Sequence, residues 1–288
     1  MLVRQQFHES KMKQVNGLTE FSMKALIIAA GLGKRLMSQT ITTPKALLNV
    51  GGETILDRMI CSLNNCRITE IGLVRGYLAE KFKDCSIKYF ENPDFKENNI
   101  LHSAMCARDF LINSANDGEP LLLTYSDIVV DKSWIEYAST MSADIALICD
   151  SNWKQRYIGR DQHPVTEAEL VVFDQEHELL QIGKIYDYVD DIGHGSSQNI
   201  AEFIGICFLT PKGILKVLNA FDELNRCLKP TDPFGNSSEF RKAYLSDLFQ
   251  FMGNAGERIF VATGGYTWFE IDTEQDLERA NNYFSKRL

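Results

Sequence analysis

The stretch KALIIAAGLGKRLMSQTITTPKALLNV, residues 24–50, carries the strongest fold signal in this chain. Its apolar run, residues 25–30, has the length of a buried strand and ends at a turn. That turn contains Gly31 and Gly33, which allow the backbone to approach a ligand closely. Basic residues follow at once and again about ten residues later. A strand, a glycine turn and fixed cations predict a polyphosphate site built from backbone N–H groups and side-chain charge.

Two common phosphate-binding loops do not fit this turn. A dinucleotide fingerprint requires a third glycine where this chain has Leu36. A P-loop requires Ser or Thr after its Gly-Lys pair, and Arg35 stands there. The pattern that does fit is A-A-G-x-G-x-R followed by P-K. It resembles the signature of the nucleotidyltransferases that make activated sugars and alcohols.

The resemblance implies a role for the loop. In that family the glycine loop wraps a nucleoside triphosphate, and an arginine and a lysine contact its phosphates, which here are Arg35 and Lys45. The simpler alternative is a structural glycine turn. The residues expected at the nucleotide are Ala29, Ala30, Gly31, Gly33, Arg35, Lys45, Gly76, Asn98 and Ser103.

The order of the predicted elements favours an α/β fold. Strands alternate with helices, which is typical of a mainly parallel sheet covered on both faces. We therefore expect a Rossmann-like three-layer α/β/α sandwich with a mainly parallel mixed sheet. Residues 151–200 contain short extended pieces and predict a small antiparallel insert. We expect this insert to form the acceptor wall of a cleft, where a second substrate, the phosphate acceptor, would bind. Expected elements include an extended segment at 45–50, one helix from about 98 to 112, and strands at 71–75, 86–90, 121–124, 144–149, 169–174 and 179–184.

Composition limits the class of protein and its compartment. The chain has 288 residues and a net charge of −9, so it lacks the basic excess of a nucleic-acid or anionic-membrane binder. No apolar run reaches the length of a transmembrane helix. Seven cysteines without a C-x-x-C pair favour reduced thiols and a cytoplasmic location. Residues 1–22 lack the apolar core of a signal peptide and are expected to be an N-terminal tail before a domain at 23–288. Whether the chain forms a homodimer stays open.

Two aspartates follow predicted strands, Asp127 in LLLTYSD and Asp272 in WFEIDT. Open α/β sheets bind ligands at the carboxyl ends of their strands. In the resembling family, one aspartate at each of these places holds Mg²⁺, whose charge neutralises the reacting phosphates. The alternatives are a turn cap for Asp127 and a helix N-cap for Asp272.

Other residues resemble the small-alcohol branch of the family. Its motifs here are N-N-x-x-x-S, D-x-x-W-x-x-R-Y and E-A-E, and the branch includes phosphocholine, 2-aminoethylphosphonate and glutamine-phosphate cytidylyltransferases. Lys184 resembles the lysine that contacts the acceptor phosphate; alternatively it is a solvated strand-end residue. Aromatic and acidic side chains would receive a cationic head group. The acceptor residues expected are Tyr125, Trp153, Tyr157, Glu169, Lys184 and Glu202, with insert packing as the alternative for Trp153 and helix capping as that for Asn98 and Ser103.

The resemblance implies a Mg²⁺-dependent enzyme that joins CMP from CTP to a small phosphate or phosphonate and releases pyrophosphate. Arg35, Lys45 and Lys184 are the expected catalytic cations. The histidines show no metal-ligand spacing, and an anionic acceptor needs no general base. Two alternatives stay open: a sugar-1-phosphate nucleotidyltransferase using UTP or dTTP, and a nucleotide-binding regulator without turnover.

Overall fold

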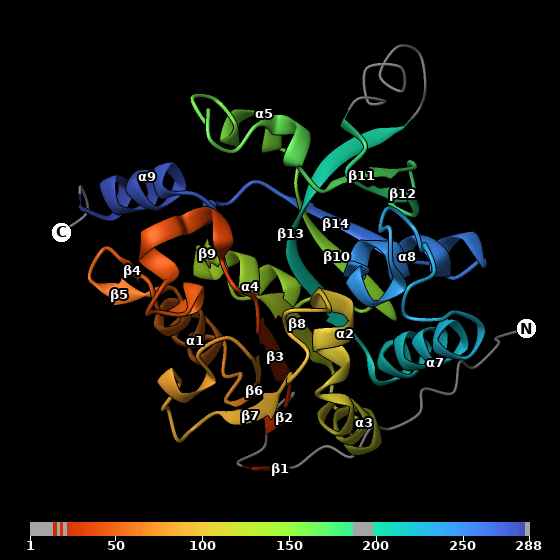
Figure 1. Cartoon of the computed structure of the whole chain (residues 1–288). Helices are drawn as coiled ribbons and strands as arrows, with labels where there is room; N and C mark the ends of the chain where they lie inside the picture. Colours follow the sequence, from red (N-terminus) through yellow and green to blue (C-terminus); the bar gives the residue numbers. More distant parts are fainter. Residues whose placement is uncertain (1–13, 16–17, 20–21, 187–197, 286–288) are drawn as a thin grey trace, which may run out of the picture.

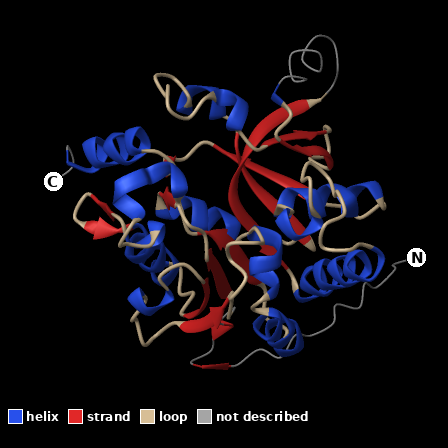
Figure 2. Cartoon of the chain, viewed as in Figure 1, coloured by secondary structure: helices blue, strands red, loops and turns tan. Residues whose placement is uncertain are grey.

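A nine-stranded mixed sheet forms the centre of the fold (Figures 1 and 2). The computed structural model describes residues 14–15, 18–19, 22–186 and 198–285. Along the main path the strands are β12 (Leu179–Gly183), β11 (Leu170–Phe173), β13 (Asn199–Leu209), β8 (Leu121–Tyr125), β3 (Lys24–Ala29), β6 (Glu70–Arg75) and β7 (Lys88–Glu91). Off this path, β10 (Ile145–Asp150) pairs with β13 and β14 (Phe260–Gly264).

The parallel part of the sheet is organised around β3. This strand pairs in parallel with β6 on one side and β8 on the other, and β6 pairs in parallel with β7. All six residues of β3 are buried, as the continuous apolar run predicts for a central strand. The expected α/β fold with a mainly parallel mixed sheet is confirmed.

The antiparallel part is organised around the long strand β13. It pairs antiparallel with β8, β10 and β11, and β11 pairs antiparallel with β12. The two strands expected in the insert therefore continue the central sheet through β13. The polar connection around 193–197 lies outside the described residues.

Helices cover both faces of the sheet (Figure 1). The helices α1 (Ile55–Asn65) and α4 (Lys132–Ala138) pack on one face, with Leu63 and Trp134 in the same apolar cluster. The other face is covered by α2 (Ile100–Met105), α3 (Arg108–Asp117), α7 (Pro211–Cys227) and α8 (Leu245–Asn254). Each helix presents an apolar stripe to the sheet, which gives the three layers.

Three local predictions were wrong. The helix expected from about 98 to 112 is two helices, because the chain tightens at Cys106 and Ala107, whose N–H groups bond three residues back. The segment 45–50 is not extended throughout: it begins as the 3₁₀ helix η2 (Lys45–Leu47) and only then forms β4 (Asn49–Val50). The insert was expected to consist of short extended pieces, but it begins with a short helix, α5 (Trp153–Arg156).

The remaining elements are short. The strand β4 pairs with β5 (Glu53–Thr54), and β1 (Gln14–Val15) pairs with β2 (Leu18–Thr19). The other 3₁₀ helices are η1 (Lys34–Thr40), η3 (Ala79–Lys81), η4 (Val165–Glu167) and η5 (Phe240–Lys242). Within the described part of the chain, no helix is long and apolar enough to cross a membrane.

A small ribbon brings two distant parts of the chain together. The strand β9 (Ile128–Val130) pairs antiparallel with β15 (Trp268–Glu270), and Ile271 N donates to Asp127 O at 2.8 Å. In an antiparallel pair, the residue before one strand lies opposite the residue after the other. Asp127 precedes β9, and Asp272 follows β15 by two residues. The helix α9 (Glu274–Ser285) begins directly afterwards.

Candidate active site

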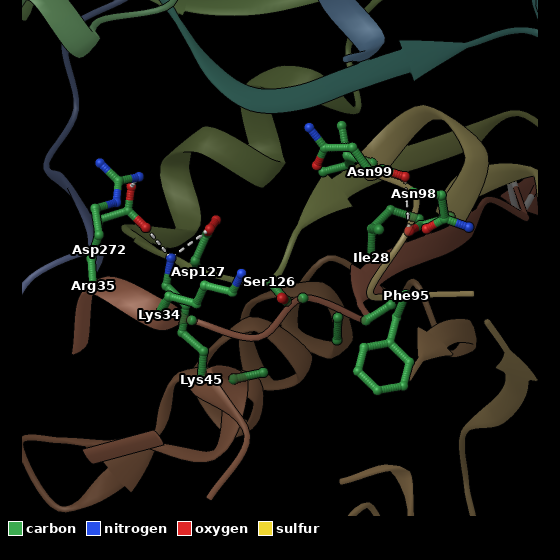
Figure 3. A pocket seen from close by; sticks show the side chains of 17 residues that line it. Ile28, Lys34, Arg35, Lys45, Phe95, Asn98, Asn99, Ser126, Asp127 and Asp272 are labelled. Carbon is green, nitrogen blue, oxygen red and sulfur yellow. Dashed lines mark hydrogen bonds and ion pairs between the residues drawn. The ribbon is translucent and has the colours of Figure 1, made fainter. Parts of the chain in front are cut away.

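A cavity of about 270 Å³ opens where β3 and β8 end (Figure 3). In Figure 3, Arg35, Lys45 and the two aspartates lie at one end, and Asn98, Asn99 and Phe95 lie at the other. One end is therefore charged and the other uncharged. The cavity is lined by Ile28, Ala29, Ala30, Gly31, Gly33, Lys34, Arg35, Lys45, Ala46, Phe95, Asn98, Asn99, Ile100, Ser103, Ser126, Asp127 and Asp272.

The two glycines of the loop have different reasons to be glycine. A Cβ on Gly31 would meet nothing within 4 Å, so the space beside it stays open to the cavity. Gly33 has φ 61°, and its Cβ would lie 3.0 Å from Thr40 Cγ2 and 3.2 Å from Lys45 Cβ. Gly31 therefore leaves room for a ligand, whereas Gly33 lets the chain turn. Gly76 does not line the cavity; its Cβ would lie 2.7 Å from Phe95 Cβ, so it lets the Phe95 side chain pack there.

Lys45 lies between the two strand-end aspartates (Figure 3). Its Nζ is 2.8 Å from Asp127 Oδ2 and forms a closer ion pair with Asp272 Oδ1. Burial alone would lower the pKa of Lys45, but the charges of Asp127 and Asp272 outweigh it and raise that pKa. The lysine is therefore a permanent cation.

Arg35 links the loop to the insert. It forms an ion pair with Asp272, and its Nη1 is 3.9 Å from Glu167 Oε2. Glu167 in turn pairs with Lys184, whose side chain is about half exposed. The three expected catalytic cations thus lie along one chain of ion pairs, although Lys184 does not line the cavity. The sequence-based prediction missed Glu167 as the link.

Asp127 carries an unsatisfied oxygen. Its Oδ1 is buried and has no hydrogen-bond partner among the described residues, while Oδ2 contacts Lys45. Buried polar atoms are nearly always paired, so an orphaned carboxylate oxygen in a cavity indicates a missing ligand. Asp127 was expected either to hold a metal or to cap the turn; no side-chain cap of this turn is seen in the described residues.

Asp272 is not the N-cap of α9. Thr273 and Asp276 form the cap: Asp276 N donates to Thr273 Oγ1 at 3.2 Å, and Thr273 N donates to Asp276 Oδ2 at 3.0 Å. Both oxygens of Asp272 instead contact cations, Oδ1 the ammonium of Lys45 and Oδ2 the guanidinium of Arg35. Burial would raise the pKa of Asp272, but these two cations lower it on balance.

A buried network of side chains, which the spacing of the histidines in the sequence did not reveal, lies next to Asp272. His163 Nδ1 is 2.7 Å from Arg160 Nη2 and 3.3 Å from Asp276 Oδ2. His163, Glu270 and Asp272 also offer possible ligand atoms within 4.8 Å of one another. His163 and Asp272 are more than 100 residues apart in the sequence, so only the fold shows that they are neighbours.

The uncharged end of the cavity is held by a small amide network. Asn92 Nδ2 donates to Asn98 Oδ1 and Ser103 Oγ, each at 2.8 Å. Ser103 Oγ also donates to Asn99 O at 3.0 Å, inside the first turn of α2. Asn98 and Ser103, which the sequence places at the nucleotide, both line the cavity. Asn92 and Phe95 were missed, although Phe95 is the one aromatic residue of the loop 92–99 and could have been suspected.

Three expected acceptor residues are buried away from the cavity. Trp153 is 2% exposed and packs in the apolar cluster of the insert. Tyr157 belongs to the same cluster and donates its hydroxyl to Glu202, which is also 2% exposed. Burial raises the pKa of Glu202 to about 8, against the Tyr157 hydrogen bond. These side chains pack the insert, as the alternative for Trp153 anticipated.

Besides Lys184, the two remaining expected acceptor residues, Tyr125 and Glu169, lie between the sheet and α8. Tyr125 ends β8 and is next to Glu169, whose carboxylate accepts a hydrogen bond from Ser246. Burial raises the pKa of Glu169 to about 7, although the Ser246 hydrogen bond opposes the shift. Neither residue lines the cavity in this structure.

These features define a class of protein. A glycine turn after the central strand, two fixed cations and two carboxylates, one after β8 of the sheet and one after β15 of the ribbon, form the site of a nucleotidyltransferase. The chain belongs to the MobA-like NTP transferase family, whose model matches residues 25–263.

Relatives of the small-alcohol branch are among the similar proteins. CTP:phosphoglutamine cytidylyltransferase of Campylobacter jejuni is 26% identical over 261 residues, covering 89% of this chain and 98% of that protein. CMP-5'-(3-aminopropyl)phosphonate synthase of Streptomyces rubellomurinus is 31% identical over 279 residues, covering 91% of this chain but 39% of that protein. The solved CTP:phosphocholine cytidylyltransferase from Streptococcus pneumoniae has a TM-score of 0.64 at 18% identity, covering 91% of this chain and 99% of that one, and shows the same fold. The resemblance drawn from the sequence is confirmed.

Proposed function

We propose that this chain is a Mg²⁺-dependent cytidylyltransferase. It joins CMP from CTP to a small phosphorylated or phosphonate compound and releases pyrophosphate. The observation that carries the proposal is the cavity itself: Lys45 lies between Asp127 and Asp272 at its charged end, and an open space faces Gly31.

The choice of CTP and of a small acceptor rests on the relatives. The similar proteins from Campylobacter jejuni and Streptomyces rubellomurinus are named for cytidylyl transfer to a small phosphate and to a phosphonate. The match to the first of these spans nearly its whole length. No side chain of the cavity selects cytosine by an obvious hydrogen-bond pattern, so the base is assigned by similarity.

The donor atoms at the charged end fit a magnesium ion. Asp127 has an unpaired buried oxygen, and Mg²⁺ prefers carboxylate oxygens completed by water and substrate phosphates. Asp127 and Asp272 would hold the ion, which would neutralise charge on the phosphates. When the triphosphate binds, Lys45 gives up its contact with at least one aspartate and contacts the phosphates instead. Before that, Lys45 is the counter-ion of the two aspartates.

The side chains have distinct tasks in the transfer. The cytidine lies toward Asn98 and Phe95, and the triphosphate lies toward the Arg35 and Lys45 cations. Lys184, released from Glu167, positions the anionic acceptor. An acceptor oxygen forms a bond to the α-phosphorus, the bond from that phosphorus to the bridging oxygen breaks, and pyrophosphate leaves with the electron pair. The acceptor oxygen is already ionised, so positioning and charge stabilisation supply the catalysis.

The direct test is pyrophosphate release from each of the four NTPs and dTTP against a panel of acceptors with Mg²⁺. The panel contains phosphocholine, 2-aminoethylphosphonate, glutamine phosphate and hexose 1-phosphates. Release with CTP and a small acceptor is expected. Release only with hexose 1-phosphates and UTP or dTTP would assign the chain to the sugar enzymes. Nucleotide binding without release on any acceptor would favour a regulator.

A further inference from the structure

A second cavity lies on the outer side of β15, between α5 and α9. Figure 1 shows these two helices at one edge of the molecule. The cavity has a volume of about 140 Å³, and no residue lines both it and the larger cavity of the glycine loop. One water occupies about 30 Å³ in the liquid, so the space holds several waters or one small ion. Three of its lining residues are arginines: Arg156, Arg160 and Arg279. We call it the arginine cavity.

Each of these arginines has a donor that the protein does not use. Arg156 bonds through Nε to Asp150 at 2.7 Å and through Nη2 to Tyr266 O at 2.8 Å. Arg160 bonds through Nε to Asp276 and through Nη2 to His163. In the described part of the chain, Nη1 of neither residue has a hydrogen bond.

Arg279 is the least satisfied of the three. Its Nη2 donates to Arg156 O at 3.1 Å, where it caps the end of α5. Its Nη1 is buried and has no partner among the described residues. Burying an N–H group without an acceptor costs free energy. A side chain with a single donor would be enough to cap α5. The capping role therefore does not explain why an arginine stands here.

The charge around Arg279 is also unbalanced. Arg156 and Arg160 each pair with a buried aspartate, and Glu270 Oε2 lies 3.6 Å from Arg160 Nη2. The described residues place no carboxylate within 4 Å of Arg279. Burial, and then the charge of Arg160, lower the pKa of Arg279, although Asp276 opposes the shift. Two carboxylates, Glu270 and Asp276, also line the cavity, but Arg279 has no ion-pair partner among the described residues.

We propose that the arginine cavity binds a small tetrahedral oxyanion, such as inorganic phosphate or a terminal phosphoryl group, between Arg156, Arg160 and Arg279. Guanidinium groups hold phosphate oxygens with short, charge-assisted hydrogen bonds. Three arginines with one unused Nη1 each match an ion with at least three acceptor oxygens, whereas a carboxylate offers two. The proposal does not depend on the reaction at the glycine loop.

The location connects the arginine cavity to the turn that carries Asp272. Arg160 anchors Asp276, and Asp276 Oδ2 accepts hydrogen bonds from the backbone N–H groups of Asp272 and Thr273, at 3.2 and 3.0 Å. An ion in the cavity therefore contacts the arginine that holds this turn.

Calorimetric titration of the full chain with inorganic phosphate tests the proposal, at constant ionic strength set with chloride. Arg279→Gln should weaken phosphate binding by roughly tenfold to a hundredfold, the value of a hydrogen bond to a charged group. Arg258→Gln removes the same charge from a side chain that is 81% exposed and outside both cavities, and should leave the affinity unchanged. Lys45→Met removes a cation from the glycine-loop cavity and should also leave this site intact.

An unchanged affinity in Arg279→Gln, or a loss in Lys45→Met, would overturn the proposal, since phosphate would then bind elsewhere. If Arg279→Gln fails to fold, because it also loses the cap of α5, crystals of the wild-type chain soaked in phosphate replace it. Density between the three guanidinium groups supports the site, and phosphate found only beside Lys45 refutes it. A terminal phosphoryl group is distinguished from the free ion by repeating the titration with glycerol 3-phosphate.

Discussion

Replacing Lys45 by methionine tests the charge balance of the glycine-loop cavity. The substitution keeps most of the side-chain volume and removes the ammonium that contacts both aspartates. Asp272 would keep its ion pair with Arg35, but Asp127 would lose the hydrogen bond to its Oδ2, and its Oδ1 is already unpaired in the described structure. The variant therefore leaves one carboxylate of the pair without any side-chain partner.

The size of the loss follows from the burial of these groups. Leaving a buried charged group unsatisfied costs about 1–3 kcal/mol or more. The Asp127 side chain is 28% exposed, so water screens part of the penalty. We expect the free energy of unfolding at pH 7 to fall by about 1–2 kcal/mol, measured by urea denaturation. Lys34→Met is the matched control, because Lys34 lines the same cavity, is exposed and forms no ion pair in the described structure.

The pH dependence has a defined sign. The pKa of Asp272 is lowered in the folded protein: burial would raise it, but Lys45 and Arg35 lower it more. A carboxyl group with a lowered folded pKa contributes stability above its unfolded pKa and loses it as pH falls through the folded value. The variant lacks the Lys45 share of this contribution. The difference from wild type should therefore be largest at neutral pH and shrink below about pH 4.

The effect of Mg²⁺ on stability tests whether the two aspartates bind a metal ion or only pack in the cavity. If the two aspartates hold Mg²⁺ as proposed, the ion competes with Lys45 for the carboxylates in the wild type but not in Lys45→Met. Mg²⁺ should therefore stabilise the variant more than the wild type, by up to about 2.7 kcal/mol at 100 times its dissociation constant. Equal stability of variant and wild type at pH 7, or an equal Mg²⁺ effect on both, would refute the reasoning.

Three further predictions concern single residues. Asp127→Asn should lower the rate of pyrophosphate release by at least roughly a hundredfold while CTP affinity, measured by calorimetry, stays within about threefold; an unchanged rate removes Asp127 from the metal site. Gly31→Val should fold normally but weaken CTP binding at least roughly tenfold, because the new side chain fills open space; unchanged affinity would show that the nucleotide lies elsewhere. Glu167→Gln should lower KM for an anionic acceptor about twofold to fivefold, because Lys184 loses its competing carboxylate; a higher KM would show that Glu167 orients the lysine.

The sequence predicted the parts of the site that depend on local order. The apolar run before Gly31 has the length of a buried strand, and a glycine turn with cations after such a strand favours a phosphate site. Asp127 and Asp272 were singled out because each follows a predicted strand, and open α/β sheets bind ligands at the carboxyl ends of their strands. Asp127 follows β8 of the central sheet, whereas Asp272 follows β15 in the two-stranded ribbon, so the sequence predicted the place of each aspartate after a strand but not their pairing.

Partners that are distant in sequence could not be predicted in this way. The pairing of β9 with β15 joins segments about 140 residues apart, and it alone sets the distance between the two aspartates. Glu167 reaches Arg35 and Lys184 only through the fold of the insert. His163 has no spacing signal because its partners Glu270 and Asp276 lie more than 100 residues away in the sequence. Each of these contacts is specified by tertiary packing.

The insert shows why the acceptor residues were harder to predict than the nucleotide loop. An aromatic or acidic side chain on a short helix or strand can face either the core or a ligand, and the sequence spacing does not say which. In the fold, Trp153 and Tyr157 pack in an apolar cluster of the insert. The Tyr157 hydroxyl donates a hydrogen bond to the buried carboxylate of Glu202. These three side chains therefore stabilise the insert. By contrast, Glu167 and Lys184 keep accessible side chains; Glu167 lies 3.9 Å from Arg35 and pairs with Lys184. If the chain acts as proposed, we therefore expect the anionic group of the acceptor, more than its head group, to meet the insert at this ion pair.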